Sequence, residues 1–200
     1  MTELLARPPT IRGAKLPLRP RHVWTIRVRL QLQRRIRDLA LFDIALDSKL
    51  RGCDVVALRL VDIAAAGALR RRATVIQQKT GRPVQFEITE QARRSLADWL
   101  RIRRDTAEGW LFPSRMRPSE HISTRQYIRL LKRWITDVGL EPAAYGTHSL
   151  RRTKVALLYR KTGNLRACQL LLGHTKLEST ARYLGVELDD ALELSEALEL

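Results

Sequence analysis

Apolar residues recur at four-residue intervals along most of this chain, and that spacing is typical of α-helices. The first such series follows a proline-rich start and runs over residues 21–46. Its apolar members are Trp24, Val28, Leu32, Ile36, Ala40 and Ile44. The spacing predicts one long helix there. Similar patterns predict helices over 52–60, 90–104, 123–138, 149–161 and 165–172, with further helical pieces after residue 176.

The middle of the chain changes to the two-residue period of β-strands. Apolar and polar side chains alternate over 84–88, which predicts a half-buried strand. Residues 61–63 and 69–78 are expected to form two further strands, and Lys79 falls where the last two strands must turn. The predicted fold class is therefore mainly α with a small three-stranded antiparallel sheet.

Charge is unevenly distributed along the chain. There are 37 Lys and Arg against 21 Asp and Glu, a formal net charge of +16. Six of the acids fall within residues 184–200, which contain no Lys or Arg, so residues 1–183 have 37 basic and 15 acidic side chains, or +22. A polyanion is the natural partner of so basic a body, and nucleic acid is the leading candidate because each neutralised phosphate releases counterions. A role of the charge in solubility alone is the alternative.

Composition and charge together predict three segments. Residues 1–20 combine prolines with basic residues, which favours an extended basic arm. Residues 21–183 are expected to form one domain, and 184–200 an acidic C-terminal helix or tail. With 44% hydrophobic residues the chain can bury a core, and without an apolar run of membrane-spanning length no membrane segment is expected. Two cysteines make neither a disulfide framework nor a metal site, so we expect a reducing, intracellular setting.

Four residues in the last third of the chain suggest chemistry on a phosphodiester. His148 and Arg151 lie three residues apart at the start of a predicted helix, for which Thr147 is the expected N-cap. An arginine grips phosphate oxygens with its planar fork, a histidine moves protons, and the hydroxyl of Tyr183 can attack. His174 and Tyr183 are nine residues apart, so they share a site only if the helix breaks near His174, and the glycine before it favours a break. Each residue alone also fits a structural role, but the whole set favours chemistry.

Together with two earlier residues, this set resembles the tyrosine recombinases, the phage-integrase family. Arg51, in Lys49-Leu50-Arg51-Gly52-Cys53-Asp54, matches the family's first arginine, and Lys79 matches its hairpin lysine. The other motifs are matched by His148-Ser149-Leu150-Arg151 and by Leu172-Gly173-His174 followed by Tyr183. The resemblance departs at Lys49, where the family has glycine. It identifies residues 21–183 as a catalytic domain without the family's usual N-terminal core-binding domain.

The resemblance implies a tyrosine recombinase catalytic-domain architecture that acts on double-stranded DNA. Tyr183 would attack a DNA phosphodiester, forming a 3′-phosphotyrosyl bond and releasing a 5′-hydroxyl, with neither a cofactor nor a metal ion required. A free tyrosine has a pKa of about 10, so a base must assist it, and His148 is the candidate.

The remaining motif residues would act on the phosphate. Arg51 and Arg151 would bind its non-bridging oxygens and stabilise the charge that develops there. Lys79 would protonate the leaving 5′-oxygen, with an ordinary turn lysine as the alternative. His174 would position the phosphate by a hydrogen bond.

The resemblance also implies a homo-oligomer, a tetramer on paired DNA sites, in a cytoplasmic, nucleoid-associated location. The apolar stripe within 184–200 would dock onto a neighbouring subunit, or alternatively pack on its own body. Two other functions stay open. One is a non-catalytic DNA-binding regulator or mobile-element remnant that keeps the fold, and the other is a topoisomerase that acts alone on one duplex.

Overall fold

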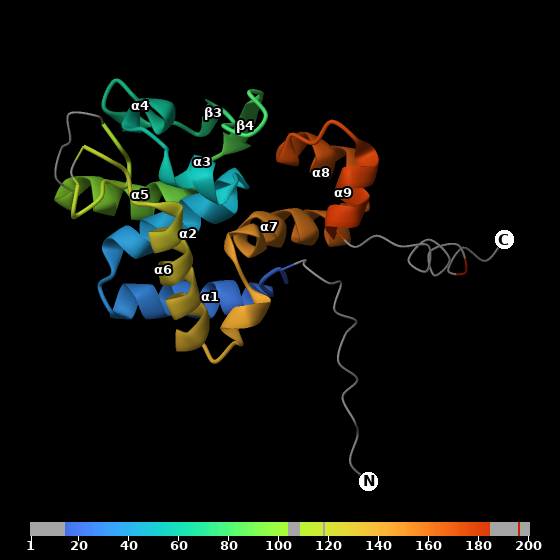
Figure 1. The fold of residues 1–200 in the computed structure, drawn as a ribbon, viewed down its shortest axis with the longest axis horizontal. Coiled ribbons are helices and arrows are strands. Elements are labelled where there is room, and N and C mark those ends of the chain that lie inside the picture. Colours follow the sequence, from blue (N-terminus) through green and yellow to red (C-terminus); the bar gives the residue numbers. More distant parts are fainter. Residues whose placement is uncertain (1–14, 104–108, 118, 185–195, 197–200) are drawn as a thin grey trace, which may run out of the picture.

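The computed structural model describes residues 15–103, 109–117, 119–184 and 196. Helices make up most of this part of the chain (Figure 1), as predicted. They are α1 (Pro20–Leu32), α2 (Ile36–Ser48), α3 (Gly52–Val56), α4 (Leu60–Ile63), α5 (Glu90–Ile102), α6 (Thr124–Asp137), α7 (Thr147–Thr162), α8 (Leu165–Leu172) and α9 (Leu177–Leu184), with a 3-10 turn at Pro142–Ala144. The bounds predicted for α8 are confirmed, and those for α5, α6 and α7 agree to within two residues.

Among the described residues, the strands form two antiparallel pairs, and the predicted single three-stranded sheet is wrong. The pairs are β1 (Ala64–Ala65) with β2 (Ala68–Leu69), and β3 (Arg72–Ile76) with β4 (Pro83–Glu87). Residues 61–63, predicted as a strand, belong to α4. The Asp62 carboxylate accepts the Arg59 backbone N–H at 2.7 Å and closes a helical turn there. The mainly helical fold class with small antiparallel sheets is confirmed.

The long helix predicted for residues 21–46 is two helices, α1 and α2. The chain turns between them at Arg34, whose φ of 50° lies in the left-handed region. A four-residue step advances 400° around a helix, so a long series with that spacing drifts around the cylinder. Trp24 and Leu32 accordingly lie 67% and 80% exposed, while α1 buries Ile26 and Leu30 instead.

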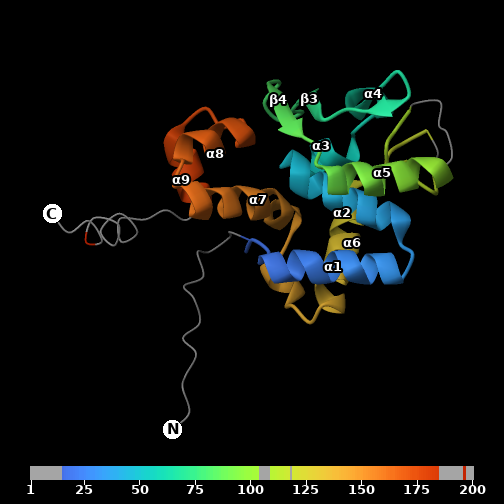
Figure 2. The same cartoon turned by 180° about the vertical axis from the view of Figure 1, so that it is seen from behind.

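Helix α2 lies at the centre of the molecule and contacts α1, α5 and α7 (Figures 1 and 2). All its residues from Asp38 to Ser48 are buried. Phe42 meets the edge of Trp134 of α6 at 5.7 Å between ring centroids. Burying side chains of this size stabilises the fold by roughly 1.5–3 kcal/mol each, so α2 is the support on which the other elements are placed.

Helices α8 and α9 stack at the far end of α7, and α8 also touches β4 (Figure 1). They enclose a second, smaller core, made of Val155, Cys168 and Leu172. The C-terminal part of the chain is therefore attached to the rest mainly through α7.

The described residues of the predicted arm pack on the body. Leu18 is buried, and its backbone N–H donates to the Thr153 hydroxyl at 2.9 Å. Residues 1–14 and most of 184–200 lie outside the described residues, so the division of the chain at residues 20 and 183 stays a prediction. In the described part, no helix is both long and apolar enough to cross a bilayer.

Candidate active site

The start of α7 is set against the start of α3 by a close approach. A Cβ placed on Gly52 would lie 3.1 Å from the Thr147 side chain, so any larger residue would push the two helix ends apart by a few tenths of an ångström or displace that side chain. Gly146, and not Thr147 as predicted, is the N-cap, because its N–H donates to the Ser149 hydroxyl at 3.1 Å and the helix already includes Thr147. This contact brings Arg51, the residue before α3, to the helix end that carries His148.

Arg151 is the most deeply buried of the predicted site residues, at 2% exposure. Its Nη2 donates to the Leu172 carbonyl at 2.7 Å, which ties α7 to the end of α8. Its Nη1 is buried and has no hydrogen-bond partner among the described residues. Burial lowers the pKa of Arg151, but an arginine stays protonated at neutral pH. A buried cation with a spare donor suits an anionic ligand such as phosphate.

Gln77 fixes Arg51 and was missed by sequence reasoning. It is fully buried at the end of β3, and its Oε1 accepts from Arg51 Nη1 and from the Thr80 hydroxyl at 3.0 Å. The Asp54 carboxylate holds the same hairpin by accepting the Gln78 N–H at 2.9 Å. The one signal available in the sequence is that the predicted strand 69–78 ends in two amide side chains, Gln77 and Gln78, directly before the predicted turn lysine.

Lys79 lies, as predicted, in the turn between β3 and β4, and its side chain is exposed. It is near enough to His148 for its charge to help lower the pKa of that imidazole. Lys79 therefore stands at the rim of the group, on a hairpin that Gln77 joins to Arg51.

His148 is surrounded by cations. Burial is the largest cause that lowers its pKa, followed by the charges of Arg151, Arg51, Arg152 and Lys79. The imidazole is consequently neutral at pH 7, the form that accepts a proton.

The predicted break before Tyr183 is confirmed. Gly173 ends α8 with φ +64°, a backbone conformation that favours glycine, and a Cβ there would lie 2.6 Å from the Val84 Cγ2, so any other residue would displace the Val84 side chain. His174 follows in the turn, where its Nδ1 pairs with the Thr180 hydroxyl at 3.1 Å. Burial, helped by Arg151 and Arg51, lowers the pKa of His174 to about 4, so this ring is neutral too.

The ring of Tyr183 packs against the small core, while its hydroxyl lies beside the cationic group. Its hydroxyl donates to the His148 carbonyl at 3.4 Å, and its ring meets the edge of His174 at 5.5 Å between centroids. The Arg152 guanidinium lies over the same ring, 5.1 Å from its centroid. Burial raises the pKa of Tyr183 to about 12 although Arg151 and Arg152 oppose it. Arg152 was not singled out from the sequence, where it is one of many arginines.

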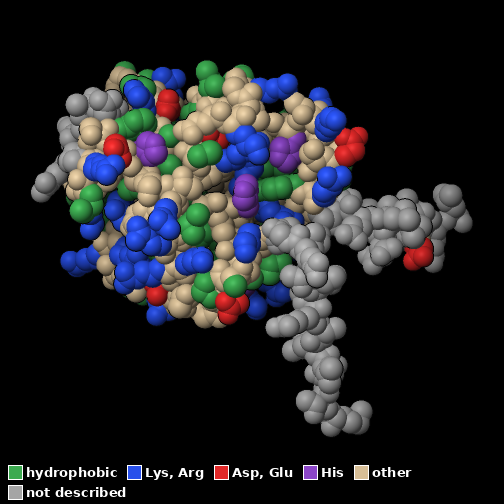
Figure 3. All heavy atoms as spheres, in the orientation of Figure 1, with side chains coloured by type: hydrophobic (Ala, Val, Ile, Leu, Met, Phe, Trp, Pro, Cys, Tyr) green, Lys and Arg blue, Asp and Glu red, His purple; other side chains and the backbone are tan. Residues whose placement is uncertain are grey.

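The structure thus gathers Arg51, His148, Arg151, His174 and Tyr183 from four separate segments, with Lys79 at the edge. On the face shown in Figure 3, histidines lie among many Lys and Arg side chains. The described residues contain no group of three side chains able to hold a metal ion. The arrangement is suited to bind a phosphate and to present a phenol to it.

Comparison with known proteins agrees with this geometry. The sequence profile of the phage integrase family matches residues 27–188. Tyrosine recombinase XerC of Psychromonas ingrahamii is 30% identical over 151 residues, which cover 74% of this chain and 48% of that protein. The probable integrase/recombinase YoeC of Bacillus subtilis is 28% identical and is matched over 79% of this chain and 82% of its own length.

Solved structures share the fold. The XerA recombinase superposes with a TM-score of 0.75 at 18% identity, covering 96% of this chain and 67% of that one. The Tn1549 transposon integrase in complex with transposon right end DNA gives 0.75 at 16% identity, with 94% and 67% covered. The chain spans about half the length of the XerC proteins that it matches.

Proposed function

Since the chain belongs to the phage integrase family, we propose that it breaks and rejoins DNA strands at specific sites through a 3′-phosphotyrosyl intermediate. The observation that carries the proposal is the Tyr183 hydroxyl, which lies 3.4 Å from the His148 carbonyl oxygen and beside the buried guanidinium of Arg151. A protein that only binds DNA has no need of a phenol held against a pair of site arginines and a neutral histidine.

The reaction exchanges one phosphate ester bond for another, because the phosphorus atom is transferred from the DNA 5′-oxygen to the Tyr183 oxygen. The Tyr183 oxygen attacks phosphorus, the bond from phosphorus to the 5′-oxygen breaks, and the phenolic proton leaves to a base. Because the phenol of Tyr183 has a pKa of about 12, deprotonation has to accompany attack. His148 is neutral and lies at the start of α7, where the Tyr183 hydroxyl contacts its backbone carbonyl, so we assign it the role of base. The reverse attack by a 5′-hydroxyl restores the DNA, and the ester bond energy is kept throughout.

The arginines supply the electrostatic part. Arg151 has an unused Nη1, and Arg51 is held by Gln77, so both fork-shaped donors are fixed before substrate arrives. A fixed donor to charge that develops in a transition state is worth on the order of 10²–10³ in rate. Lys79, on the exposed hairpin, would protonate the leaving 5′-oxygen, and His174 would hydrogen-bond the phosphate.

A basic helix face supports double-stranded DNA as the substrate. Helix α6 buries Tyr127, Leu130, Leu131, Trp134 and Ile135 on one side. Its exposed side presents Arg125, Arg129, Lys132 and Arg133. Such a face binds a phosphate backbone without needing a base sequence.

We further propose that the protein assembles as a tetramer on paired DNA sites. The segment expected to mediate it, 184–200, lies almost wholly outside the described residues, so a tetramer rests on the resemblance alone. A cytoplasmic, nucleoid-associated location would follow from recombinase activity on chromosomal or mobile-element DNA.

The test is covalent capture of DNA. The full chain is incubated with a pool of nicked duplexes that carry a randomised central sequence, so that a short 5′-hydroxyl fragment is lost after cleavage and the adduct accumulates. We expect an SDS-resistant adduct, with a nucleotide on the Tyr183 peptide by mass spectrometry. Tyr183→Phe should abolish the adduct and keep DNA binding, because only the nucleophilic oxygen is removed.

Tyr159→Phe is the matched control, since Tyr159 packs near the same small core and should keep the adduct. An adduct in Tyr183→Phe would reject the nucleophile assignment. DNA binding without any adduct in the wild type would favour the non-catalytic DNA-binding alternative.

A further inference from the structure

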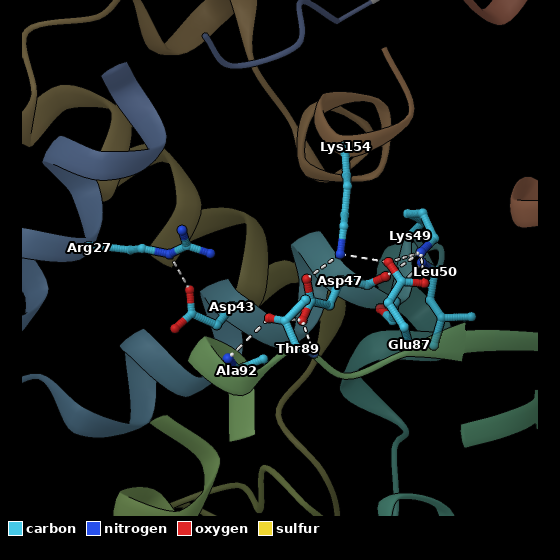
Figure 4. Close-up of polar contacts among 10 residues, drawn as sticks. Arg27, Asp43, Asp47, Lys49, Leu50, Glu87, Thr89, Ala92 and Lys154 are labelled. Carbon is cyan, nitrogen blue, oxygen red and sulfur yellow. Dashed lines mark hydrogen bonds and ion pairs between the residues drawn. The ribbon is translucent and has the colours of Figure 1, made fainter. Parts of the chain in front are cut away.

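Two lysines and two carboxylates form one connected group between α2, β4 and α7 (Figure 4). Lys154 Nζ lies 2.6 Å from Asp47 Oδ1 and 2.6 Å from Glu87 Oε1. Lys49 Nζ lies 2.7 Å from Glu87 Oε2 and donates to the Asp47 backbone carbonyl at 2.6 Å. The second Asp47 oxygen accepts the N–H of Thr89 at 2.7 Å and its hydroxyl at 2.6 Å. We call Asp47, Lys49, Glu87 and Lys154 the four-charge cluster.

Half of this cluster is removed from solvent. The side chains of Lys49 and Asp47 are 1% and 4% exposed, against 33% for Lys154 and 37% for Glu87. Buried charges persist where each has a partner, and here two positive and two negative groups form three ion pairs. Burial would lower the pKa of Lys154, but Asp47 and Glu87 outweigh it and raise that pKa. Lys154 and Lys49 likewise lower the pKa of Glu87 against the effect of burial, whereas burial lowers the pKa of Lys49 against the effect of Glu87.

Lys49 is an unusual residue for its backbone position. Its φ of 54° is left-handed, a conformation that residues with a Cβ rarely adopt. The side chain nevertheless turns inward and is bound at three oxygens. The contacts of its ammonium group, not backbone freedom, hold the turn that leads into Arg51.

Each of the three joined elements carries part of the candidate active site. Lys49 stands two residues before Arg51, and Lys154 stands one turn after Arg151 on α7. Glu87 ends β4, the strand whose hairpin presents Lys79. The four-charge cluster therefore joins the three segments that carry Arg51, Arg151 and Lys79. These are the side chains that must meet at one phosphate.

We propose that the four-charge cluster is a positioning device that sets the distances between Arg51, Arg151 and the Lys79 hairpin. The inference rests on the proposed function, because positioning has meaning only for a reaction at these residues. Asp47 and Glu87 act as the two bridges, and Lys154 closes the link to α7. None of the four contacts the substrate.

Lys154→Met tests the link, since it keeps the aliphatic stem and removes the charge. At saturating nicked duplex, the rate of adduct formation should fall about tenfold, because small displacements of reacting groups cost rate steeply. The Kd for the same DNA should change less than about twofold, since no phosphate contact of the proposed site is lost. Lys154→Arg, which can still bridge two carboxylates, should restore most of the rate. Lys161→Met, an exposed lysine of the same helix, is the matched control and should match wild type.

A second measurement does not depend on activity. Amide hydrogen exchange over residues 49–54 and 77–87 should rise about tenfold in Lys154→Met and stay at the wild-type level in Lys161→Met. If Lys154→Met does not fold, Glu87→Gln replaces it, because that variant removes a bridging charge with little change in size.

The outcomes separate the two proposals. A folded Lys154→Met or Glu87→Gln protein with wild-type adduct rate would overturn the positioning role. So would unchanged exchange in both segments. If the wild type forms no adduct, the proposed function fails, and the exchange experiment then decides alone whether the cluster couples the three elements.

Discussion

The arginines and the tyrosine of the candidate site are supported by two parts of the molecule that differ in packing. Arg51 and Arg151 each follow a fully buried leucine, Leu50 or Leu150, that belongs to the main core. Tyr183 belongs to α9, which rests on the small core of Val155, Cys168 and Leu172. The two arginines are therefore held by the main core, which we call the body. Tyr183 is held by α8 and α9 on the small core, which we call the attachment.

This difference bears on how the site could be controlled. Regions with few buried apolar contacts open at a lower free energy than the whole domain. Opening of α8 and α9 would withdraw Tyr183 while Arg51 stays on its Gln77 contact. Arg151 would then lose its bond to the Leu172 carbonyl of α8 but stay on α7. We therefore expect Tyr183 to be the adjustable member of the site and Arg51 to be the fixed one.

The largest effect should come from Arg151. Arg151→Met should lower the rate of adduct formation by about 10²–10³, because a preorganised donor to the developing charge is lost. Its stability should fall by no more than about 1 kcal/mol, because the bond from Nη2 to the Leu172 carbonyl is lost while a buried cation with an unpartnered Nη1 is also removed. Urea unfolding and adduct formation measured together check this. Arg160→Met, on the exposed end of α7, is the control, and a parallel loss of stability and cleavage in Arg151→Met would contradict the assignment.

A pair of leucine truncations compares the two cores directly. Leu131 and Leu172 are both fully buried, in the main and the small core respectively. Leu131→Ala should cost about 3–5 kcal/mol of unfolding free energy and Leu172→Ala about 2 kcal/mol, because the small core can collapse around the gap. At temperatures where both remain folded, only Leu172→Ala should slow adduct formation. Equal stability losses with equal rates would show that the two cores form one unit.

Local signals in the sequence predicted parts of both regions. In the attachment, the bounds of α8 and the break at Gly173 follow from a helix-ending glycine, and in the body the turn at Lys79 follows from a change of period. The split between α1 and α2 at Arg34 could not be read in the same way, because no proline or glycine marks it and the apolar spacing continues through it. Only the docking of α2 among α1, α5 and α7 decides where the chain turns.

The same limit applies to the site. The six predicted residues were found through their order in the sequence, whereas Gln77 and Arg152 have significance only through contacts between distant segments. Gln77 meets Arg51 across 26 positions, and Arg152 lies over Tyr183 across 31. A single sequence contains no signal for such pairings, and the four-charge cluster escaped notice for the same reason.

The pH dependence of stability should report the burial of His174 in the turn between α8 and α9. The pKa of His174 falls from 6.5 to about 4 on folding, so between these values the unfolded chain binds a proton that the folded chain does not. Stability is therefore full above pH 6.5 and is lost as pH falls toward 4. Allowing for solvent screening around this half-buried ring, the loss should be about 1–2 kcal/mol. Urea unfolding of wild type and His174→Gln at pH 7 and 4.5 checks it, and an identical pH dependence of the two proteins would refute the burial of this ring.

The smallest effect is expected from the hydrogen bond that joins α9 to the turn before it. Thr180 is fully buried, and its hydroxyl pairs with His174 Nδ1 at 3.1 Å. Thr180→Val keeps the shape and removes that hydrogen bond, so the opening free energy of α9, measured by amide exchange, should fall by about 1 kcal/mol. Thr162→Val, which removes an exposed hydroxyl contact on α7, is the control and should leave α9 unchanged. Because Arg51 and Arg151 do not depend on this contact, DNA binding should persist in Thr180→Val, and a loss of binding would mean that the two sides of the site are not separable.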